Sequence, residues 1–571
     1  MKKTLSIIMA LCMVLSVCFF SVSAAEAKVG SVAANYVPEG TAITDAAGFA
    51  AMAADGKYYL ANDITLDATW NAGAAVSATY KENAAFTGTL DGNGKTITTS
   101  APLFANLQGT VKNLTVEGKI ADTELHNANI TMWTNGTVVF DNVYTKATIT
   151  SGTTCGGFIG YAATGSNVTI TNCRNDADIT CSSQVGGFVG YIQDNVLLMD
   201  NCVNYGNMTT ANYGAGLVGR FGRDAAKAPD SDCKITNSVN YGKVVGAKGQ
   251  TAGILGYLVG AAVITDCANY GEIVNETSTA GGIFGAPADK KEQCTILIKD
   301  CANYGKVDAP AVIGGIAGRL GRNAPHADGS FRIENCVNYG AVNAKATEGY
   351  TATIYMGGIA GYSYGGGEAH PNGIVNSVNA GDVTVDSTNS TGSTYIGGLT
   401  GYVNSSHFET KNNVNAGKVT LTGNATTICA TVYNKNADSY NTVNNYSVAI
   451  EGIAVALVGE TPAEAPAFAI AVTADQIANG TVAGLINEAA GATIYYQAIG
   501  TDKVPVLEAA KDGSNAIVKN ADGSFGNPAK EVPEDTKPAD PVPTGDSALI
   551  FAVVAIISIL GVATVAKRRE N

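Results

Sequence analysis

Charged residues and strong helix formers are scarce in this 571-residue sequence. Only 15% of the residues are Asp, Glu, Lys or Arg, whereas Gly alone occupies 67 positions. Long surface helices need many Leu, Glu and Lys residues, so a mainly helical fold is disfavoured. A chain rich in Gly, Asn, Thr and Val has to pair its backbone polar groups in β ladders instead.

Histidine and paired cysteines are also scarce. The four His residues, at positions 126, 326, 370 and 407, are scattered, and no Cys-x-x-Cys spacing occurs. The sequence therefore predicts no metal site. We expect no cofactor either, because the dinucleotide-like run Gly214–Gly219 is not followed by helical sequence. The net charge of −14 argues against nucleic acid or an anionic membrane surface as a partner.

The two ends of the chain carry export signals. Lys2 and Lys3 precede an apolar run and then small residues, which predicts a signal peptide over 1–27. Residues 547–566 lack charge, and at ~1.5 Å per residue a helix of this length spans a ~30 Å hydrocarbon core. The basic tail 567–571 then stays in the cytoplasm. We therefore expect an extracellular protein that is anchored through a C-terminal transmembrane helix.

Most of the remaining chain is an internal repeat with two halves. The first half reads Gly-Gly-apolar-x-Gly, as at 156–160, 186–190 and 281–285. The second half reads Asn-Cys-x-Asn-Tyr-Gly, as at 201–206 and around Cys267, Cys301 and Cys336. Successive copies are 29 to 41 residues apart. This pattern indicates one structural unit with insertions at a loop.

Short alternating runs such as Val168-Thr169-Ile170 predict strands within each unit, and Gly and Asn predict the turns between them. About three short strands with corners would make one coil of a parallel β-helix, and coils stack ~4.8 Å apart. Equivalent residues then lie over one another. One asparagine column would form a ladder of side-chain hydrogen bonds at a corner. Its members are Asn175, Asn204, Asn240, Asn269, Asn303, Asn338, Asn379 and Asn415.

The repeat cysteines form a neighbouring column. Cys202, Cys267, Cys301 and Cys336 share one place in the unit, and Ser238 and Ser377 stand there in other copies. Small buried filler is the expected role, because free Cys is often buried and a disulfide partner would not be replaced by Ser. Asp266 and Asp300 stand where other copies have Asn, so we interpret them as turn residues.

These Gly-Gly-apolar-x-Gly and Asn-Cys-x-Asn-Tyr-Gly runs resemble the GLUG-type motif of exported proteins from Gram-positive and gut bacteria. The resemblance covers roughly residues 85 to 445 and implies an all-β fold, a right-handed parallel β-helix. The preceding run Phe86–Ile97 is similar to the opening coils of such β-helices. The resemblance implies little about activity.

The segments around the repeat suggest further divisions. We predict an N-terminal cap over 28–84 with a short helix at 45–54, a C-terminal capping module over 450–525 with a helix at 475–487, and a Pro-rich stalk over 526–546. The stalk ends in Pro541-Val542-Pro543-Thr544-Gly545. Followed by a membrane span and a basic tail, this run resembles a sortase sorting signal. Thr544 and Gly545 match the usual pentapeptide, whereas Pro541 and Val542 depart from it. The resemblance implies attachment to the wall of a Gram-positive cell, or retention in its membrane if sortase refuses the signal.

Tyrosines supply the candidate binding face. One column consists of Tyr205, Tyr241, Tyr270, Tyr304 and Tyr339. If exposed, such a stripe suits sugars or a protein partner; the alternative is that each ring packs over its own corner and only stabilises the sheet. A second column has the same two readings. It contains Tyr161, Tyr191, Tyr257, Tyr362 and Tyr402, with Arg220 and Arg319.

No group of residues stands out as catalytic. A hydrolase needs paired carboxylates, and carboxylates such as Glu334 are sparse on the coils. We therefore expect a non-enzymatic surface protein that binds a surface glycan or a host or neighbouring protein, as an adhesin does. The alternatives are an extracellular polysaccharide lyase or hydrolase and a passive surface spacer.

Overall fold

The computed structural model describes residues 29–67, 70, 85–121, 125–193, 196–223, 232–288, 294–321, 330–364, 372–404, 407–423, 427–434, 440–451, 453–454, 456–458, 461–462 and 469–528. All of them belong to one compact unit, Met1–Pro528. The expected signal peptide, membrane helix, basic tail, Thr544 and Gly545 lie outside the described residues. None of the helices in the described ranges is long and apolar enough to cross a membrane.

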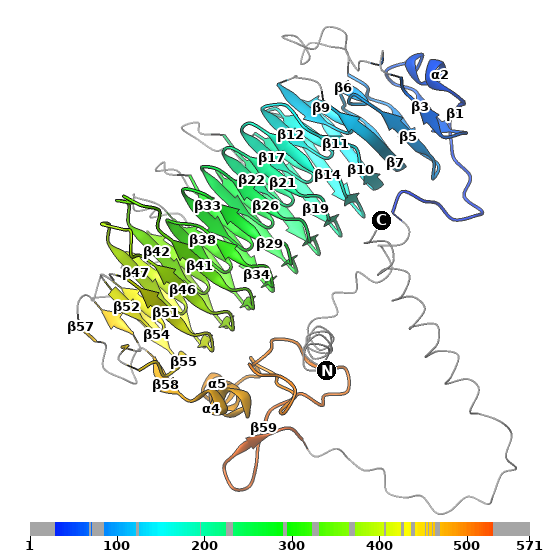
Figure 1. Ribbon diagram of the computed structural model, residues 1–571. Helices are drawn as coiled ribbons and strands as arrows, with labels where there is room; N and C mark the ends of the chain where they lie inside the picture. Colours follow the sequence, from blue (N-terminus) through cyan, green and yellow to red (C-terminus); the bar gives the residue numbers. More distant parts are fainter. Residues whose placement is uncertain are drawn as a thin grey trace, which may run out of the picture. The chain divides into compact units, whose positions relative to one another are not determined.

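The described chain is an all-β parallel solenoid (Figure 1). One coil consists of β19 (Val196–Asp200), β20 (Val203–Asn204), β21 (Met208–Thr210), β22 (Tyr213–Ala215) and β23 (Val218–Phe221). Each strand pairs in parallel with its equivalent one coil later, so that Asn204 lies over Asn240. The prediction of about three strands per coil was too low, because corners divide the coil into five short segments.

Each kind of strand recurs along the stack. The strands that carry the ladder asparagine are β15 (Arg174–Asn175), β20, β25 (Val239–Asn240), β30 (Ala268–Asn269), β35 (Ala302–Asn303), β40 (Val337–Asn338), β45 (Val378–Asn379) and β50 (Val414–Asn415), and β55 (Tyr446–Val448) continues the series with Ser447 at that place. Before them run β14 (Asn167–Thr171), β19, β24 (Asp232–Thr236), β29 (Ala261–Thr265), β34 (Thr295–Lys299), β39 (Phe331–Glu334), β44 (Asn372–Val375), β49 (Phe408–Lys411) and β54 (Tyr440–Val443). After them run β16 (Ile179–Cys181), β21, β26 (Val244–Gly246), β31 (Ile273–Asn275), β36 (Val307–Asp308), β41 (Val342–Lys345), β46 (Val383–Asp386) and β51 (Val419–Thr422), and β11 (Thr148–Ile149) has the same place in the coil before β15.

Two further sheets complete the coils. A ten-stranded sheet contains β8 (His126–Ala128), β12 (Thr154–Gly156), β17 (Gln184–Gly186), β22, β27 (Gln250–Ala252), β32 (Thr279–Gly281), β37 (Val312–Gly314), β42 (Ile354–Gly357), β47 (Thr394–Gly397) and β52 (Thr427–Cys429). The other contains β6 (Phe104–Asn106), β9 (Thr131–Thr134), β13 (Ile159–Ala162), β18 (Val189–Ile192), β23, β28 (Leu255–Leu258), β33 (Phe284–Pro287), β38 (Ala317–Leu320), β43 (Ala360–Tyr364), β48 (Thr400–Asn404), β53 (Val432–Asn434), β56 (Leu457–Val458) and β57 (Thr461–Pro462).

The corner before each asparagine strand is made by an Asn or Asp in the left-handed region. The φ angles at this place run from 49° to 57° between Asn113 and Asn444. Asn and Asp tolerate this conformation better than other non-Gly residues. Asp266 and Asp300, with φ angles of 54° and 52°, occupy it as well. The interpretation of both as turn residues is confirmed.

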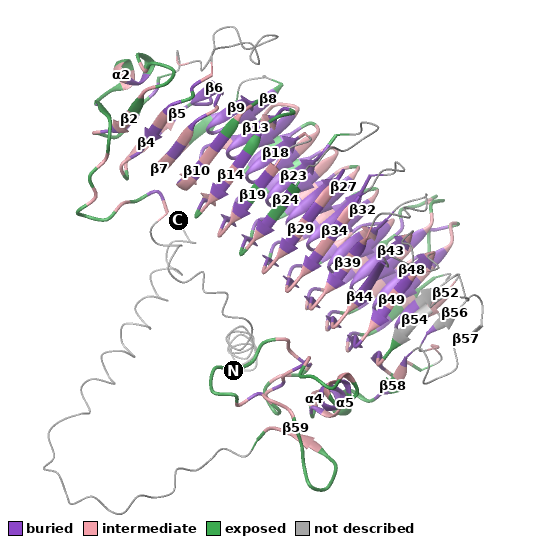
Figure 2. Cartoon of the chain, turned by 180° about the vertical axis from the view of Figure 1, so that it is seen from behind, coloured by how far each residue is buried: buried purple, intermediate pink, exposed green. Residues whose placement is uncertain are grey.

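The glycine pair marks the corner between the two smaller sheets. A Cβ added to Gly157 would lie 2.2 Å from the carbonyl oxygen of Gly187 and 2.6 Å from Oδ1 of Asn175. No other residue fits so close to the backbone of the next coil. Apolar side chains on the inward face, such as Phe158 and Phe188, stack through the interior, and Figure 2 shows buried residues along the strands of the whole stack.

Parallel pairing begins near the N-terminus. β1 (Thr41–Ile43), β2 (Lys57–Leu60), β4 (Thr89–Asp91), β7 (Thr110–Ile120) and β10 (Thr137–Thr145) pair in succession, and β3 (Ile64–Thr65) pairs with β5 (Thr96–Thr99). The short helix expected near residue 45 is α2 (Ala46–Ala50), and Asp45 caps it by accepting a hydrogen bond from the Gly48 amide.

The C-terminal module follows β58 (Ile470–Val472) and ends with the pair β59 (Val518–Lys519) and β60 (Phe525–Gly526). The single helix predicted over 475–487 is wrong. The segment forms α4 (Ala474–Ala478) and α5 (Thr481–Ala490), because Gly480 takes a φ of 81° and breaks the helix between them. Thr473 and Gln476 form a capping box at the start of α4.

Candidate binding face

The asparagine column forms the predicted ladder. From Asn175 to Asn415, each Nδ2 donates to the Oδ1 of the next asparagine at 2.7–2.9 Å. Most of these amides also donate to a backbone carbonyl two residues on, as Asn204 does to Gly206 at 2.9 Å. All eight side chains are fully buried. The ladder therefore pairs polar groups that burial would otherwise leave unsatisfied, and it fixes the adjoining residues at the same height in every coil.

The cysteine column fills the interior beside the ladder. Cys202, Cys267, Cys301 and Cys336 are free and buried, as are the other described cysteines. Ser238 takes the same place in its coil, where its hydroxyl accepts a hydrogen bond from the Cys202 amide at 3.1 Å. The prediction of a buried filler is confirmed. Burial raises the pKa of Cys233 and Cys429, which keeps these two side chains in the unreactive thiol form.

The five tyrosines that follow the asparagines stack into one column, which we call the tyrosine ladder: Tyr205, Tyr241, Tyr270, Tyr304 and Tyr339. Successive ring centroids are 4.8, 4.9, 4.4 and 5.0 Å apart, with interplanar angles of 5° to 12°. The backbone sets this spacing, because the Tyr241 amide donates to the Asn204 carbonyl at 2.7 Å and later coils repeat the bond.

The tyrosine ladder faces outward. Tyr241 is 38% exposed and Tyr270 is 36% exposed, and the other three rings are half-buried. Because the rings are nearly parallel and in contact, their π-faces are covered by one another. The exposed surface consists of ring edges, and the hydroxyl of Tyr304 is buried. The expected stripe exists, but it offers sugars no free ring face between its two ends.

An arginine closes the first end of the tyrosine ladder. The Arg174 guanidinium lies 4.4 Å from the Tyr205 ring centroid and 5.0 Å from that of Tyr144. Asp176 accepts from Arg174 Nε and Nη2 at 2.7 and 2.8 Å and from the Tyr144 hydroxyl at 2.5 Å. Burial and this hydrogen bond raise the pKa of Tyr144. The repeat pattern did not predict this group, although Asp176 stands at the tyrosine place of its coil.

The C-terminal module closes the other end. Val337, Val378, Val414 and Tyr446 point outward from successive coils and pack with Ile477, Val482 and Ile486 of the module. Tyr339 packs against the same cluster. In these coils the tyrosine place is held by Ala380 and Ala416. Tyr495 of the module is fully buried and donates its hydroxyl to the Asn412 carbonyl at 2.7 Å.

Charged residues of both signs border the tyrosine ladder. On the side of the left-handed corner stand Asp266 and Asp300, and burial together with Asp300 raises the pKa of Asp266. On the other side Lys243 pairs with Glu272 at 2.7 Å, and Lys306 pairs with Asp308 at 2.5 Å. An aromatic strip with a charged and polar rim has the composition of a binding surface.

The second tyrosine column is also aligned, but it is packed into a corner. Tyr161 lies over Tyr191, Tyr191 over Arg220, and Arg220 over Tyr257. The Arg220 guanidinium lies 4.6 to 5.5 Å from the ring centroids of Tyr191, Tyr213 and Tyr257. Tyr191, Arg220 and Tyr257 are at most 9% exposed. Tyr362, Tyr402 and Arg319 continue the column.

The facing sheet supplies the partners that sequence reasoning missed. His126, Tyr213, Tyr355 and Tyr395 stand on it, and Tyr213 stacks on Tyr257 with centroids 4.5 Å apart. The aromatic rings and guanidinium groups of this column are already in contact with one another. The structure therefore favours a role in stabilising the sheets over a role in binding a ligand.

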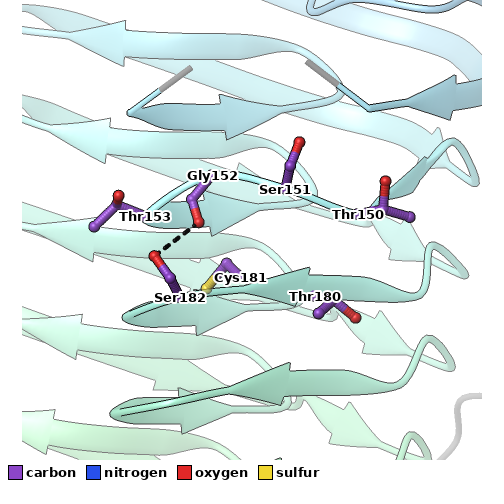
Figure 3. Close-up of a pocket in the computed structure, with 7 residues that line it drawn as sticks. All are labelled: Thr150, Ser151, Gly152, Thr153, Thr180, Cys181 and Ser182. Carbon is purple, nitrogen blue, oxygen red and sulfur yellow. Dashed lines mark hydrogen bonds between the residues drawn. The ribbon is translucent and has the colours of Figure 1, made fainter. Parts of the chain in front are cut away.

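A shallow pocket lies away from both columns, between the coils of β12 and β17. It is lined by Thr150, Ser151, Gly152, Thr153, Thr180, Cys181 and Ser182. Figure 3 shows the Ser182 hydroxyl donating to the Gly152 carbonyl, at 3.2 Å. Its lining contains no charged side chain, so it lacks an acid, a base or a cation that would act on a substrate.

One pair of carboxylates is brought together on β39 and β49. Arg332 Nε donates to Glu334 at 2.7 Å and Arg332 Nη2 donates to Glu409 at 3.0 Å, across the intervening Gly373. Glu334 was expected from the sequence as a carboxylate on the coils, whereas Arg332 and Glu409 were not. Because one arginine pairs with both carboxylates, this group is better suited to link three coils than to act as a catalytic acid and base. In the described ranges no three His, Cys, Asp or Glu side chains are grouped to hold a metal.

We compared the chain with known protein families, sequences and structures. No protein-family profile and no characterised protein sequence matches the chain. One solved structure, described as a "putative immunoglobulin A1 protease from Bacteroides ovatus", aligns with 57% of this chain and 86% of its own at 18% identity and a TM-score of 0.27. At that score the likeness carries no argument about fold or activity.

Proposed function

We propose that this protein is an extracellular, surface-anchored solenoid that acts as an adhesin and binds its partner along the tyrosine ladder. The observation that carries the proposal is the run of stacked, outward-facing tyrosines at the centre of a rim of charged pairs. Tyrosine is enriched at binding surfaces, because it combines a large rigid ring with a hydroxyl that hydrogen-bonds.

The arrangement supports binding over a purely passive spacer. The C-terminal module packs on the apolar strip that contains Val378 and Val414. In these two coils the tyrosine place is held by the small residues Ala380 and Ala416. Five coils carry tyrosines at that place, and two of these tyrosines are more than a third exposed. An exposed aromatic strip is a typical partner site.

A paired-variant binding assay tests the proposal. The full chain is applied to immobilised glycans and to purified extracellular proteins, as wild type and as the double variant Tyr270→Ala with Tyr304→Ala. We expect binding to a ligand on the panel and its loss in the double variant. Leu198→Ala is the matched control, because Leu198 is apolar, 42% exposed and outside the ladder. Circular dichroism verifies that both variants fold.

Two outcomes would contradict the proposal. Equal binding by wild type and double variant would place the partner elsewhere, and no binding to any immobilised ligand would favour the spacer. Release of reducing sugars from a polysaccharide by the wild-type chain would establish the enzymatic alternative.

The proposal also includes three features that were predicted from the sequence. These are the right-handed winding, which parallel crossover connections adopt almost without exception, the export signal, and attachment to a Gram-positive cell through the C-terminal segment.

A further inference from the structure

We infer that Cys155 and Cys181 form a redox-active pair of thiols, which a small organic disulfide oxidises through the shallow pocket to a cross-link between two successive coils. The tyrosine ladder contains neither residue, so the pair is independent of the proposed binding function. Three observations support it: the contact between the two thiols, the access that the pocket gives to one of them, and the hydrogen-bond donors around that sulfur.

The fold brings the two cysteines together from successive coils. Cys155 lies in β12, and Cys181 ends β16 in the following coil. The Ser182 amide donates to the Gly152 carbonyl at 2.9 Å, which holds the turns of the two coils against each other. In the same turn Cys155 Sγ donates to the Ser151 carbonyl at 3.3 Å. The Cys155 thiol also hydrogen-bonds to Cys181, so the two side chains are in direct contact.

The pocket gives access to one of the two sulfurs. Cys181 is part of the pocket lining, among the Ser, Thr and Gly residues of the two turns (Figure 3). It is 7% exposed, whereas Cys155 is fully buried. The other described cysteines are each at most 2% exposed. A small reagent therefore meets Cys181 first, and Cys155 waits beside it on the inner side.

Hydrogen-bond donors around Cys181 stabilise its thiolate. The hydrogen bond from the Cys155 thiol lowers the pKa of Cys181 against the opposing effect of burial. The Thr210 hydroxyl, whose Oγ1 lies 3.6 Å from Cys181 Sγ, and the backbone amide of Ser183 lower this pKa further. Because the thiolate is the nucleophile in thiol–disulfide exchange, Cys181 is the thiol that attacks.

The cysteine column also brings thiols together, but it seals them in the interior. Cys173 hydrogen-bonds to Cys202, and Cys301 hydrogen-bonds to Cys267 and Cys336. Burial raises the pKa of Cys301, and the hydrogen bonds from its two neighbours lower it overall. Yet all five thiols are at most 2% exposed. We therefore expect the column to stay reduced in the folded chain, which makes it an internal comparison for the exposed pair.

The reaction consists of two exchange steps with a disulfide R–S–S–R. The Cys181 thiolate attacks one sulfur and forms a mixed disulfide, and the R–S⁻ that leaves takes up the proton that Cys181 lost. The Cys155 thiolate then attacks the Cys181 sulfur, and the second R–S⁻ leaves with the proton of Cys155. The chain loses two electrons and two protons, and R–S–S–R becomes two R–SH. The product ties β12 to β16.

The test exposes the reduced, folded full chain to oxidised glutathione and maps its peptides by mass spectrometry without reduction, so that each cysteine is read separately. We expect Cys155 and Cys181 to be recovered as one disulfide-linked peptide pair that has lost two hydrogen atoms. Cys155→Ser removes the second thiol, so one glutathione should stay attached to Cys181. Cys181→Ser should leave Cys155 reduced. Cys301→Ser, in the cysteine column, is the matched control and should oxidise as the wild type does.

Three results would overturn the inference: Cys155 and Cys181 that both stay reduced in the folded chain, column cysteines that oxidise as fast as this pair, or a Cys155→Ser chain that gains no glutathione at Cys181. Circular dichroism verifies that the variants fold, and the wild-type peptide map decides the first two results without them. Failure here would leave the tyrosine ladder untouched, because its binding assay uses other residues.

Discussion

Two positions that are three residues apart, and that are mostly asparagine, have different roles in each coil. Asn172, Asn201 and their equivalents take a left-handed φ and turn the chain at a surface corner. Asn175, Asn204 and their equivalents are buried and pass hydrogen bonds along the axis. The first role needs a side chain that tolerates an unusual backbone, so Asp266 and Asp300 substitute there. The second needs a donor and an acceptor at once, and no Asp occurs from Asn175 to Asn415 in that column.

Breaking the buried ladder should cost stability. Asn269→Ala leaves the Nδ2 of Asn240 without its acceptor and the Oδ1 of Asn303 without its donor. We expect a loss of about 1–3 kcal/mol in the free energy of unfolding, because buried polar groups lose their partners. Urea denaturation followed by circular dichroism measures it. Asn207→Ala, at an exposed position, is the control, and an equal loss in both would show that the ladder adds nothing.

His126 should make stability depend on pH. Burial lowers its pKa from an ordinary value of 6.5 to about 4. Below pH 6.5 the unfolded chain takes up a proton that the folded chain refuses until about pH 4. Stability therefore falls as pH drops through this window, by up to about 3 kcal/mol. His126→Phe keeps a ring beside Tyr161 and should flatten the decline between pH 6.5 and 4.5; unfolding curves that shift equally for both proteins would refute this.

At the scale of elements, one outward apolar column is bordered in two ways. The tyrosine ladder runs beside it from β20 to β40, and the C-terminal module packs on it at β40, β45, β50 and β55. The two overlap at β40, where both Val337 and Tyr339 contact the module, and beyond it Ala380 follows the asparagine. The capping module is therefore attached by side-chain packing against the flank of the solenoid, and α4 and α5 provide its apolar face.

Removing one hydroxyl should loosen the module. Tyr495 donates to the Asn412 carbonyl from a fully buried position, so Tyr495→Phe leaves that carbonyl unpaired at a cost of about 1–2 kcal/mol. We expect faster cleavage within residues 473–528 under limited proteolysis, while the coils resist. Tyr496→Phe, at the half-exposed neighbour, should cleave at the wild-type rate; a Tyr495→Phe protein that does the same would contradict the docking role.

Features that depend on the repeat could be predicted, because stacking puts equivalent residues at one height. The asparagine ladder, the cysteine filler and the alignment of Tyr205 to Tyr339 all followed from copy number and position. Features between unlike segments could not. The docking of Tyr495 and the Arg332 contact to Glu409 depend on insertions of different length and on Gly373, and a repeat alignment treats these as departures. The nearly parallel orientation of the rings in the tyrosine ladder could not be predicted either, because side-chain packing sets it and the spacing of the repeats does not.

At the scale of the whole molecule, the solenoid and the predicted export signals would have separate roles. The solenoid supplies a long surface whose stability is spread over neighbouring coils, and the predicted anchor lies beyond it, outside the described residues.

The attachment itself is a prediction that the sequence makes and that a cell experiment decides. If sortase accepts Pro541-Val542-Pro543-Thr544-Gly545, the chain is cut after Thr544 and joined to the wall, so mass spectrometry of wall digests should find a C-terminal peptide that ends at Thr544 and carries a wall fragment. Thr544→Ala should move the protein to the membrane fraction, held by residues 547–566. Val542→Ala is the matched control, because Val542 already departs from the usual signal. A wild-type protein found wholly in the membrane fraction would show that the signal is refused and that the apolar segment alone holds the solenoid at the surface.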